Sequence, residues 1–161
     1  MSLNASDIVK LLGLQPLPEE GGYFLRSYQA NDRVLLDRGE RPVGDAIYYL
    51  ITEDQFSGLH KLKCDEMWHF YAGDPVEMLL FDNNEFNLVE IGNSDFTKHL
   101  PQKLVRANQW QGTKLKPGGK WALLGTNAFP GYAQEDFAMG QLDMFQGRSH
   151  EQLEIIKRYA K

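Results

Sequence analysis

The chain has 161 residues, of which 42% are hydrophobic and 24% are charged, and its formal net charge at pH 7 is -5. This size and composition predict one globular domain over residues 1–161, and the acidic balance argues against non-specific nucleic-acid binding. The longest apolar run, Ala46–Ile51, is too short to span a membrane, no secretory pattern opens the chain, and the one cysteine cannot form an internal disulfide, so we expect a cytoplasmic protein with no membrane partner.

The chain opens with the pattern of a short helix. Asn4 can cap it by accepting a hydrogen bond from the backbone of Asp7, and Gly13 suits the left-handed position that ends a helix. The apolar stripe of this helix would consist of Ile8, Leu11 and Leu12. A second short helix is predicted near the end of the chain, where Ser149 and Gln152 can form a capping box and the apolar face would hold Leu153, Ile156 and Tyr159.

Between these helices, short runs rich in apolar or aromatic residues alternate with turn compositions. The runs are 23–28, 46–51, 56–62, 66–71, 76–81, 86–91, 103–107, 110–115, 121–129 and 136–140. Turn signals at intervals of roughly 8 to 12 residues are typical of a β-sandwich or barrel. No long helical pattern separates the runs, so a parallel α/β sheet is not expected. The fold class predicted is therefore all-β.

Charged residues are unevenly distributed in the middle of the chain. Residues 64–97 contain acidic residues but no Lys or Arg, whereas residues 98–120 contain six basic residues and no acidic one. One interpretation is that neighbouring antiparallel strands place opposite charges across from one another. The other is that the basic stretch lines an entrance that attracts anions.

Motifs of several common enzyme classes are absent. The sequence contains no GxGxxG, no Walker loop, no CxxC, no HExxH and no GxSxG. Cys64 lies in a predicted turn beside Lys63, whose charge could lower the pKa of the thiol. Because no histidine partner is evident in the sequence, we interpret this cysteine as incidental rather than nucleophilic.

The segment 58–73 carries the most informative chemistry. Read as two strands around a tight turn, it places Glu66, Trp68 and Phe70 on one face of the second strand. The two aromatic residues belong inside, so Glu66 is predicted to point inside with them, and antiparallel pairing would bring it into one cavity with His60. A carboxylate and an imidazole are costly to bury unless they pair, bind a metal or meet a ligand. By the same alternation His69 faces the other way, and we interpret it as structural or as part of a subunit contact.

This segment resembles the first motif of the cupin superfamily, G(x)5HxH(x)3-4E(x)6G. His60, Glu66 and Gly73 fall at its first histidine, its glutamate and its final glycine. The sequence departs from the motif at its leading glycine, and Leu62 occupies the position of the second histidine. Only a trace of the second cupin motif is present, with Gln111 at the position of its histidine. Two of the four metal ligands that the resemblance implies are therefore replaced.

Further stretches between about residues 8 and 140 are similar to one small branch of bacterial and fungal cupins, known mainly as a domain of unknown function. They are residues 12–14, 20–26, 47–50, 66–70, 73–75, 130–131 and 135–137. The resemblance implies a single-domain β jelly roll with a ligand cavity inside the barrel, usually in a homodimer. Residues 21–26 are also loosely similar to a segment of the dTDP-sugar epimerases of the rhamnose pathway, which are cupins that work without a metal.

The resemblance to cupins implies that His60 and Glu66 are the candidate catalytic residues and act as an acid-base pair. Together with Gln111 they are also the candidate ligands of a weakly bound divalent metal, and we expect either that metal or no cofactor. The alternative to a functional role is that His60 and Glu66 only form a structural hydrogen bond inside the barrel. The candidate ligand-binding residues are Arg26, Trp68, Phe70, Arg106, Gln111 and Trp121. The arginines could hold a carboxylate or phosphate and the aromatic rings could stack on a flat ligand, unless they form surface ion pairs and fill the core.

Three functions follow from this sequence. The first is a small-molecule enzyme with isomerase-like or epimerase-like acid-base chemistry on a sugar-like or nucleotide-like metabolite, in which His60 is the general base and Glu66 orients it. The second is a binding protein that holds such a metabolite without converting it. The third and weakest is a metal-dependent dioxygenase, which the replaced metal ligands disfavour.

Overall fold

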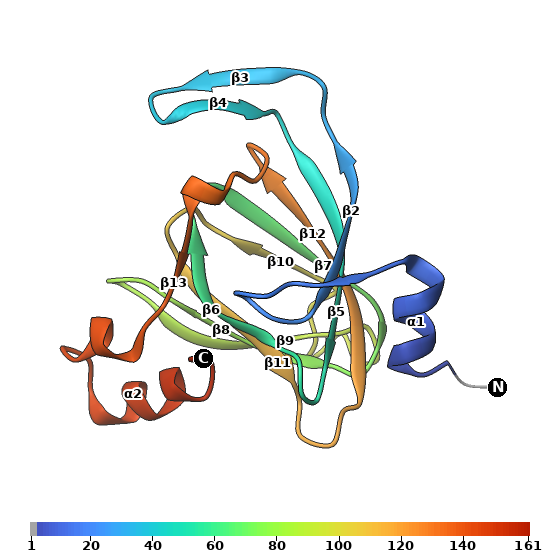
Figure 1. The fold of residues 1–161 in the computed structure, drawn as a ribbon. Coiled ribbons are helices and arrows are strands. Elements are labelled where there is room, and N and C mark those ends of the chain that lie inside the picture. Colours follow the sequence, from blue (N-terminus) through green and yellow to red (C-terminus); the bar gives the residue numbers. More distant parts are fainter. Residues whose placement is uncertain (1–2) are drawn as a thin grey trace.

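Two antiparallel sheets make up most of the protein, as the computed structural model of residues 3–161 shows (Figure 1). The larger sheet has the strand order β1–β2–β5–β12–β7–β10, with the bounds Gln15–Pro16, Tyr23–Gln29, Asp45–Thr52, Trp121–Phe129, Asp65–Gly73 and Gln102–Val105. The smaller sheet has the order β13–β6–β11–β8–β9, with the bounds Phe137–Met139, Ser57–Leu62, Trp110–Leu115, Val76–Phe81 and Phe86–Ile91. A hairpin of β3 (Arg33–Leu36) and β4 (Gly39–Pro42) projects beyond both sheets.

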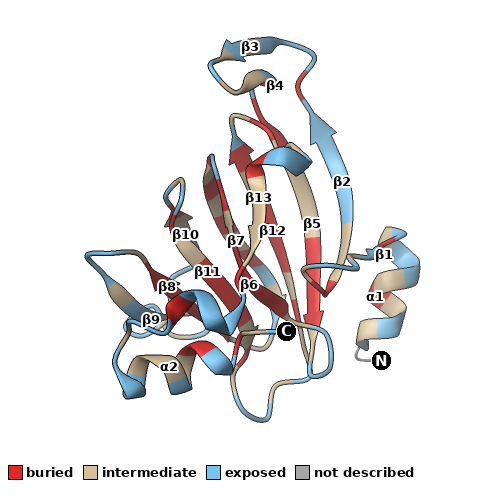
Figure 2. Ribbon diagram, turned by 60° about the vertical axis from the view of Figure 1, so that its left-hand side comes forward, coloured by how far each residue is buried: buried red, intermediate tan, exposed pale blue. Residues whose placement is uncertain are grey.

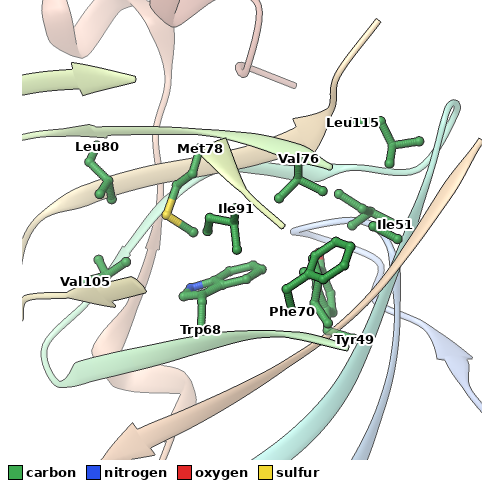
Figure 3. Close-up of a cluster of buried hydrophobic side chains, with 12 residues drawn as sticks. Tyr49, Ile51, Trp68, Phe70, Val76, Met78, Leu80, Ile91, Val105 and Leu115 are labelled. Atoms are coloured by element: carbon green, nitrogen blue, oxygen red, sulfur yellow. The ribbon is translucent and has the colours of Figure 1, made fainter. Parts of the chain in front are cut away.

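The main core lies between the inner faces of the two sheets. Along each strand alternate side chains point inward, and Figure 3 shows Trp68 and Phe70 of the larger sheet lying opposite Val76, Met78 and Ile91 of the smaller one. In Figure 2 the buried residues follow these inner strands, whereas much of β2 is exposed. This arrangement confirms the predicted all-β jelly roll.

Each predicted run overlaps an observed strand, but the short strands β1, β3 and β4 were not expected. The β3–β4 hairpin covers no core, and Leu35 at its centre is 81% exposed. The sequence of β3, with three consecutive apolar residues, therefore lacks the alternation of apolar and polar residues that marks a half-buried strand. The hairpin is attached instead by the buried guanidinium of Arg41, which donates to Asp136 from Nε at 2.9 Å and from a terminal nitrogen at 3.0 Å. Asp136 ends a short 3-10 helix, η1 (Gln134–Asp136), ahead of β13.

Both predicted terminal helices are present, as α1 (Ala5–Leu12) and α2 (His150–Lys157), and a second 3-10 helix, η2 (Leu142–Phe145), precedes α2. Asn4 and Asp7 form a reciprocal capping box, and Gly13 adopts the expected left-handed conformation. The predicted apolar stripe was wrong at Leu11, which is 70% exposed, because Ile8 rather than Leu11 faces the larger sheet. In residues 3–161 no helix is long and apolar enough to cross a membrane.

Gly73, the last residue of β7, occupies a position that accepts no side chain. Its φ is +100°, and a Cβ there would lie 2.4 Å from the backbone oxygen of Trp121. We expect Gly73→Ala to lower the free energy of unfolding by about 1–3 kcal/mol, measured by denaturant titration. Gly118→Ala is the matched control, because Gly118 also has a positive φ, +88°, but a Cβ there meets nothing within 4 Å. Equal losses in the two variants would contradict the clash with Trp121.

Candidate functional site

A cavity of about 330 Å³ lies between the two sheets, beneath the segment that leads into β2. Its apolar wall comes from both sheets and from the loop that precedes β2, and it consists of Leu17, Pro18, Phe24, Ile47, Leu62, Ala128 and Phe137. The ionisable side chains that line it are Glu19, Glu20, Arg26, Asp45, Glu66 and Tyr132. A mostly apolar hollow of this size with a few polar groups is typical of a small-molecule site.

Glu66 reaches this cavity because it lies on the inward face of β7, as its spacing from Trp68 predicted. The residue is 7% exposed, and its Oε2 accepts a hydrogen bond of 2.6 Å from the side-chain amide of Gln111 on β11. That amide oxygen in turn accepts from the indole N–H of Trp68 at 2.9 Å. The Gln111 amide thus connects the two sheets. Because the indole of Trp68 donates to the amide oxygen, the amide nitrogen is the atom that faces Glu66.

Burial is the main influence on the protonation of Glu66. It raises the pKa of this carboxyl above its ordinary value, and the negative charge of Glu20 adds to that effect. The charge of His60 and hydrogen bonds from Gln111 and Thr126 act in the opposite direction and lower the pKa of Glu66. The result is a carboxyl that binds a proton more strongly than an exposed glutamate does and that faces the cavity.

His60 lies near Glu66, but by a different route from the one predicted. β6 pairs with β11 and β13, whereas β7 pairs with β12 and β10, so the expected antiparallel pairing of the two strands was wrong. The two residues approach instead across the space between the sheets. His60 is 1% exposed and is not a lining residue, and its ring stacks on the lining ring of Phe137, with centroids 5.5 Å apart.

The orientation of the His60 ring follows from its hydrogen bond. Nδ1 lies 2.8 Å from the carbonyl oxygen of Gly58, and because a carbonyl oxygen only accepts, Nδ1 carries a proton. The other nitrogen, Nε2, lies 3.9 Å from Oε2 of Glu20. His60 was predicted to act on the substrate, whereas the structure places Glu66 at the cavity and His60 behind its wall.

Glu20 is a site residue that the sequence reasoning missed. It lines the cavity, and its Oε1 accepts a hydrogen bond of 2.6 Å from the hydroxyl of Ser57. The available signal was the Glu20-Gly21-Gly22 stretch, because both glycines have positive φ, +94° and +74°, and turn the chain so that Glu20 faces inward. Asp45 and Tyr132, which are also lining residues, carried no comparable signal.

The structure separates the predicted ligand-binding residues into three groups. Arg26 lines the cavity. Trp68 and Phe70 fill the core, and Gln111 stands behind Glu66 rather than at the cavity wall. Two predicted residues lie elsewhere. Arg106 is exposed and pairs with Asp65 at 3.0 Å, and Trp121 packs against the cluster beneath α1, so neither belongs to the candidate site.

The basic stretch 98–120 does not line an entrance to the cavity. Lys116 on the loop after β11 pairs with Glu90 and Glu77 of the neighbouring strands β9 and β8, and Arg106 pairs with Asp65. The uneven charge distribution is therefore explained by ion pairs between adjacent segments, the first of the two interpretations.

A metal ion fits this site poorly. Among residues 3–161, no group of three or more His, Cys, Asp or Glu is arranged to hold one. Of the predicted ligands, Gln111 already bonds to Glu66 and to Trp68, and Nδ1 of His60 is committed to Gly58. Leu62 stands on the cavity wall at the position of the absent second histidine.

Two remaining residues have structural explanations. Cys64 is 3% exposed, and burial raises the pKa of its thiol to about 12, the opposite of the expected lowering by Lys63, so the thiol stays protonated at neutral pH. His69 faces away from the core as predicted. Its Nε2 lies 2.7 Å from the side-chain oxygen of Asn127, and its Nδ1 lies 2.9 Å from the side-chain nitrogen of Gln102.

The chain is similar to a known protein family and to several solved structures. The family model described as "Cupin superfamily (DUF985)" matches residues 6–140. A solved structure of a hypothetical protein from Leishmania major is 25% identical, with a TM-score of 0.89 over 98% of this chain and 99% of that chain. A protein from Shewanella oneidensis is 24% identical, with a TM-score of 0.88 over 99% of both chains. A dTDP sugar isomerase from Desulfovibrio desulfuricans G20 is 11% identical, with a TM-score of 0.54 over 73% of this chain and 83% of that chain. No curated protein matches the chain.

Proposed function

The chain belongs to the cupin superfamily, in the family DUF985, and from this premise we propose that it is a small-molecule enzyme that transfers protons on a metabolite held in the cavity. The observation that carries the proposal is Glu66. This buried carboxyl lines a mostly apolar cavity, binds its proton more strongly than usual, and is held in place by Gln111. Perturbed carboxyls in such hollows are characteristic of general acid-base catalysts.

The reaction we propose is isomerisation or epimerisation at a carbon next to a carbonyl group. The carboxylate of Glu66 takes the proton from that carbon, the C–H bond breaks, and its electron pair moves into an enolate. Return of this proton by Glu66 to the neighbouring carbon gives the isomer. The epimer requires a second acid that protonates the opposite face of the same carbon, a role for which the cavity offers the hydroxyl of Tyr132. A raised pKa favours Glu66 in this role, because the carboxylate is then a stronger base.

The other residues near Glu66 serve as positioning groups. Gln111 fixes one oxygen of the carboxyl, and its own orientation depends on the indole of Trp68. The charge of His60 lowers the pKa of Glu66 and so favours the carboxylate, the form that accepts a proton.

The substrate class we propose is sugar-like or nucleotide-like. Phe24, Tyr132 and Phe137 give the cavity aromatic surfaces suited to one face of a flat ring or a sugar ring. The dTDP sugar isomerase that shares the fold offers a precedent for isomerisation of sugars in a barrel of this kind, at 11% identity. The volume of about 330 Å³ suits a small metabolite.

Exchange of carbon-bound hydrogen with solvent tests this proposal directly. The protein is incubated in D2O with aldoses, amino sugars and nucleotide-linked sugars, and deuterium next to the carbonyl is measured by NMR and mass spectrometry. We expect incorporation into at least one class with the wild type and not with Glu66→Gln. A ligand that binds in stoichiometric amounts and is returned without deuterium would overturn the proposal in favour of a binding protein.

A further inference from the structure

The charge of the cavity indicates which ligands it accepts. Among the described residues that line it, Glu19, Glu20, Asp45 and Glu66 supply carboxyl groups, and Arg26 is the only basic residue. The second of the two interpretations of the sequence was the reverse, an entrance attractive to anions. The walls of the cavity thus hold more acidic than basic groups. Burial raises the pKa of Asp45 and of Glu66, and a positively charged ligand would favour the ionised form of both carboxyls.

Arg26 does little to offset this excess. Its Nε lies 3.9 Å from Oδ2 of Asp45, so an anion that approached the guanidinium would also meet a carboxylate. The arginine side chain is 42% exposed, whereas that of Asp45 is 4% exposed, which places the positive charge toward solvent and the negative charge inside. Solvent weakens the field of the outer charge more than that of the inner one.

The two inner carboxyls accept their hydrogen bonds from neutral donors, and the basic group near them is the imidazole of His60, whose Nε2 lies 3.9 Å from Oε2 of Glu20. Glu20 accepts from the hydroxyl of Ser57, and Glu66 accepts from the amide of Gln111. Within the part of the chain that the structure describes, neither forms an ion pair with a lysine or arginine. Lys161 is close enough for Glu20 to influence its pKa but lies outside ion-pair distance. A cationic ligand would supply the permanent counter-charge that no lysine or arginine supplies to these two carboxyls.

The aromatic wall favours the same class of ligand. Phe24, Tyr132 and Phe137 line the cavity together with the carboxyls, and the faces of aromatic rings attract ammonium groups. The pKa of Tyr132 is raised to about 12, first by burial and next by the charges of Glu20 and Glu19, as expected in a negative field. A bare metal ion does not suit this arrangement, because no three acidic or histidine side chains in residues 3–161 converge on one point.

We propose that the cavity selects a small organic cation, an amine-bearing metabolite whose ammonium group lies among Glu20, Asp45 and Glu66, and that it disfavours phosphorylated and carboxylated analogues. This inference rests on the proposed function in one respect, that the same cavity is the substrate site. Within the sugar-like class it points to aminated sugars rather than to nucleotide-linked ones.

Three probes with the same pyranose ring separate charge from shape. D-glucosamine is a cation, N-acetyl-D-glucosamine is neutral and D-glucuronate is an anion. Their affinities are measured by NMR titration, followed at the backbone amides of the cavity residues Thr126 and Ala128. We expect glucosamine to bind the wild type about tenfold more tightly than the neutral analogue, with glucuronate weakest, and added salt to reduce the preference. Equal or tighter binding of glucuronate, or cavity amides unmoved by glucosamine, would overturn the proposal.

Two variants assign the preference to the cavity. Glu20→Gln keeps an acceptor for Ser57 and removes one charge, so it is expected to weaken glucosamine binding about tenfold and to leave N-acetyl-D-glucosamine unchanged. Glu53→Gln removes a charge from the exposed β5–β6 turn and is expected to change neither. An unchanged preference in Glu20→Gln would refute the assignment.

Failure of this proposal is distinct from failure of the proposed function. Cation binding without deuterium exchange rejects only the enzyme, and exchange on an anionic substrate rejects only the charge preference.

Discussion

Replacing Glu66 with glutamine is expected to lower turnover in the cavity by about 10²- to 10⁴-fold, because the variant loses the group that accepts the proton. The glutamine side chain has the same shape, and its oxygen can still accept the hydrogen bond from Gln111. Ligand binding should therefore persist while exchange of carbon-bound hydrogen stops. Steady-state kinetics, with Kd measured separately, distinguishes the two.

The same substitution should change how stability depends on pH. Burial raises the pKa of Glu66 above its ordinary value of 4.5, so the folded protein holds this proton to higher pH than the unfolded chain does. Stability from this group is fully present below the ordinary pKa and is lost as pH rises through the folded pKa. Glu66→Gln lacks that loss, so at neutral pH it should unfold at the same temperature as the wild type or a higher one. Thermal unfolding of the wild type and of Glu66→Gln, measured from below pH 4.5 to above neutral pH, gives the difference in stability between them.

Asp65→Asn is the matched control for both measurements. Asp65 precedes Glu66 on β7 and faces the opposite side of the sheet, where it bonds to Arg106 and to the backbone of Ala107. Turnover in this variant should stay within a few-fold of the wild type. If Glu66→Gln retained turnover at the level of Asp65→Asn, the role of Glu66 as acid-base group would be excluded.

Trp68→Ala is expected to have the largest effect on stability, lowering the free energy of unfolding by about 3–5 kcal/mol. The indole is 1% exposed and lies in the main core, edge-on to Tyr49 with ring centroids 5.6 Å apart (Figure 3). Its removal leaves a large cavity between two sheets that cannot collapse far, since both are fixed by their strand ladders. Denaturant titration measures the loss.

Two further tryptophan variants separate packing from hydrogen bonding. Trp68→Phe keeps most of the ring but leaves the amide oxygen of Gln111 without its donor, at an expected cost of about 1–3 kcal/mol. Because Gln111 is then free to turn, this variant should also lower turnover. Trp121→Ala removes a half-buried indole on the outer side of the larger sheet and should cost less than Trp68→Ala. Equal losses at Trp68 and Trp121 would contradict the assignment of the core.

The local features of this protein follow from its sequence. Asn4 and Gly13 bound α1 because capping depends on residues within one turn of helix. Glu66 points inward because side chains alternate along a strand, and Trp68 and Phe70 reveal which face is buried. The resemblance to the cupin motif predicted the jelly-roll fold and identified Gly73 as the final glycine of the motif. The homodimer and the cytoplasmic location stay predictions.

The site depended on the tertiary structure, because alternation gives the face of a side chain but not the sheet that the strand joins. β6 and β7 are consecutive yet lie in different sheets, so His60 and Glu66 meet across the barrel rather than along a hairpin. Glu20 enters from a loop before β2, and Asp45 from β5. The cavity itself is the volume that separate segments leave unfilled, and its acidic charge is the sum of their contributions. Such a volume depends on long-range register and packing, which no local pattern of residues encodes.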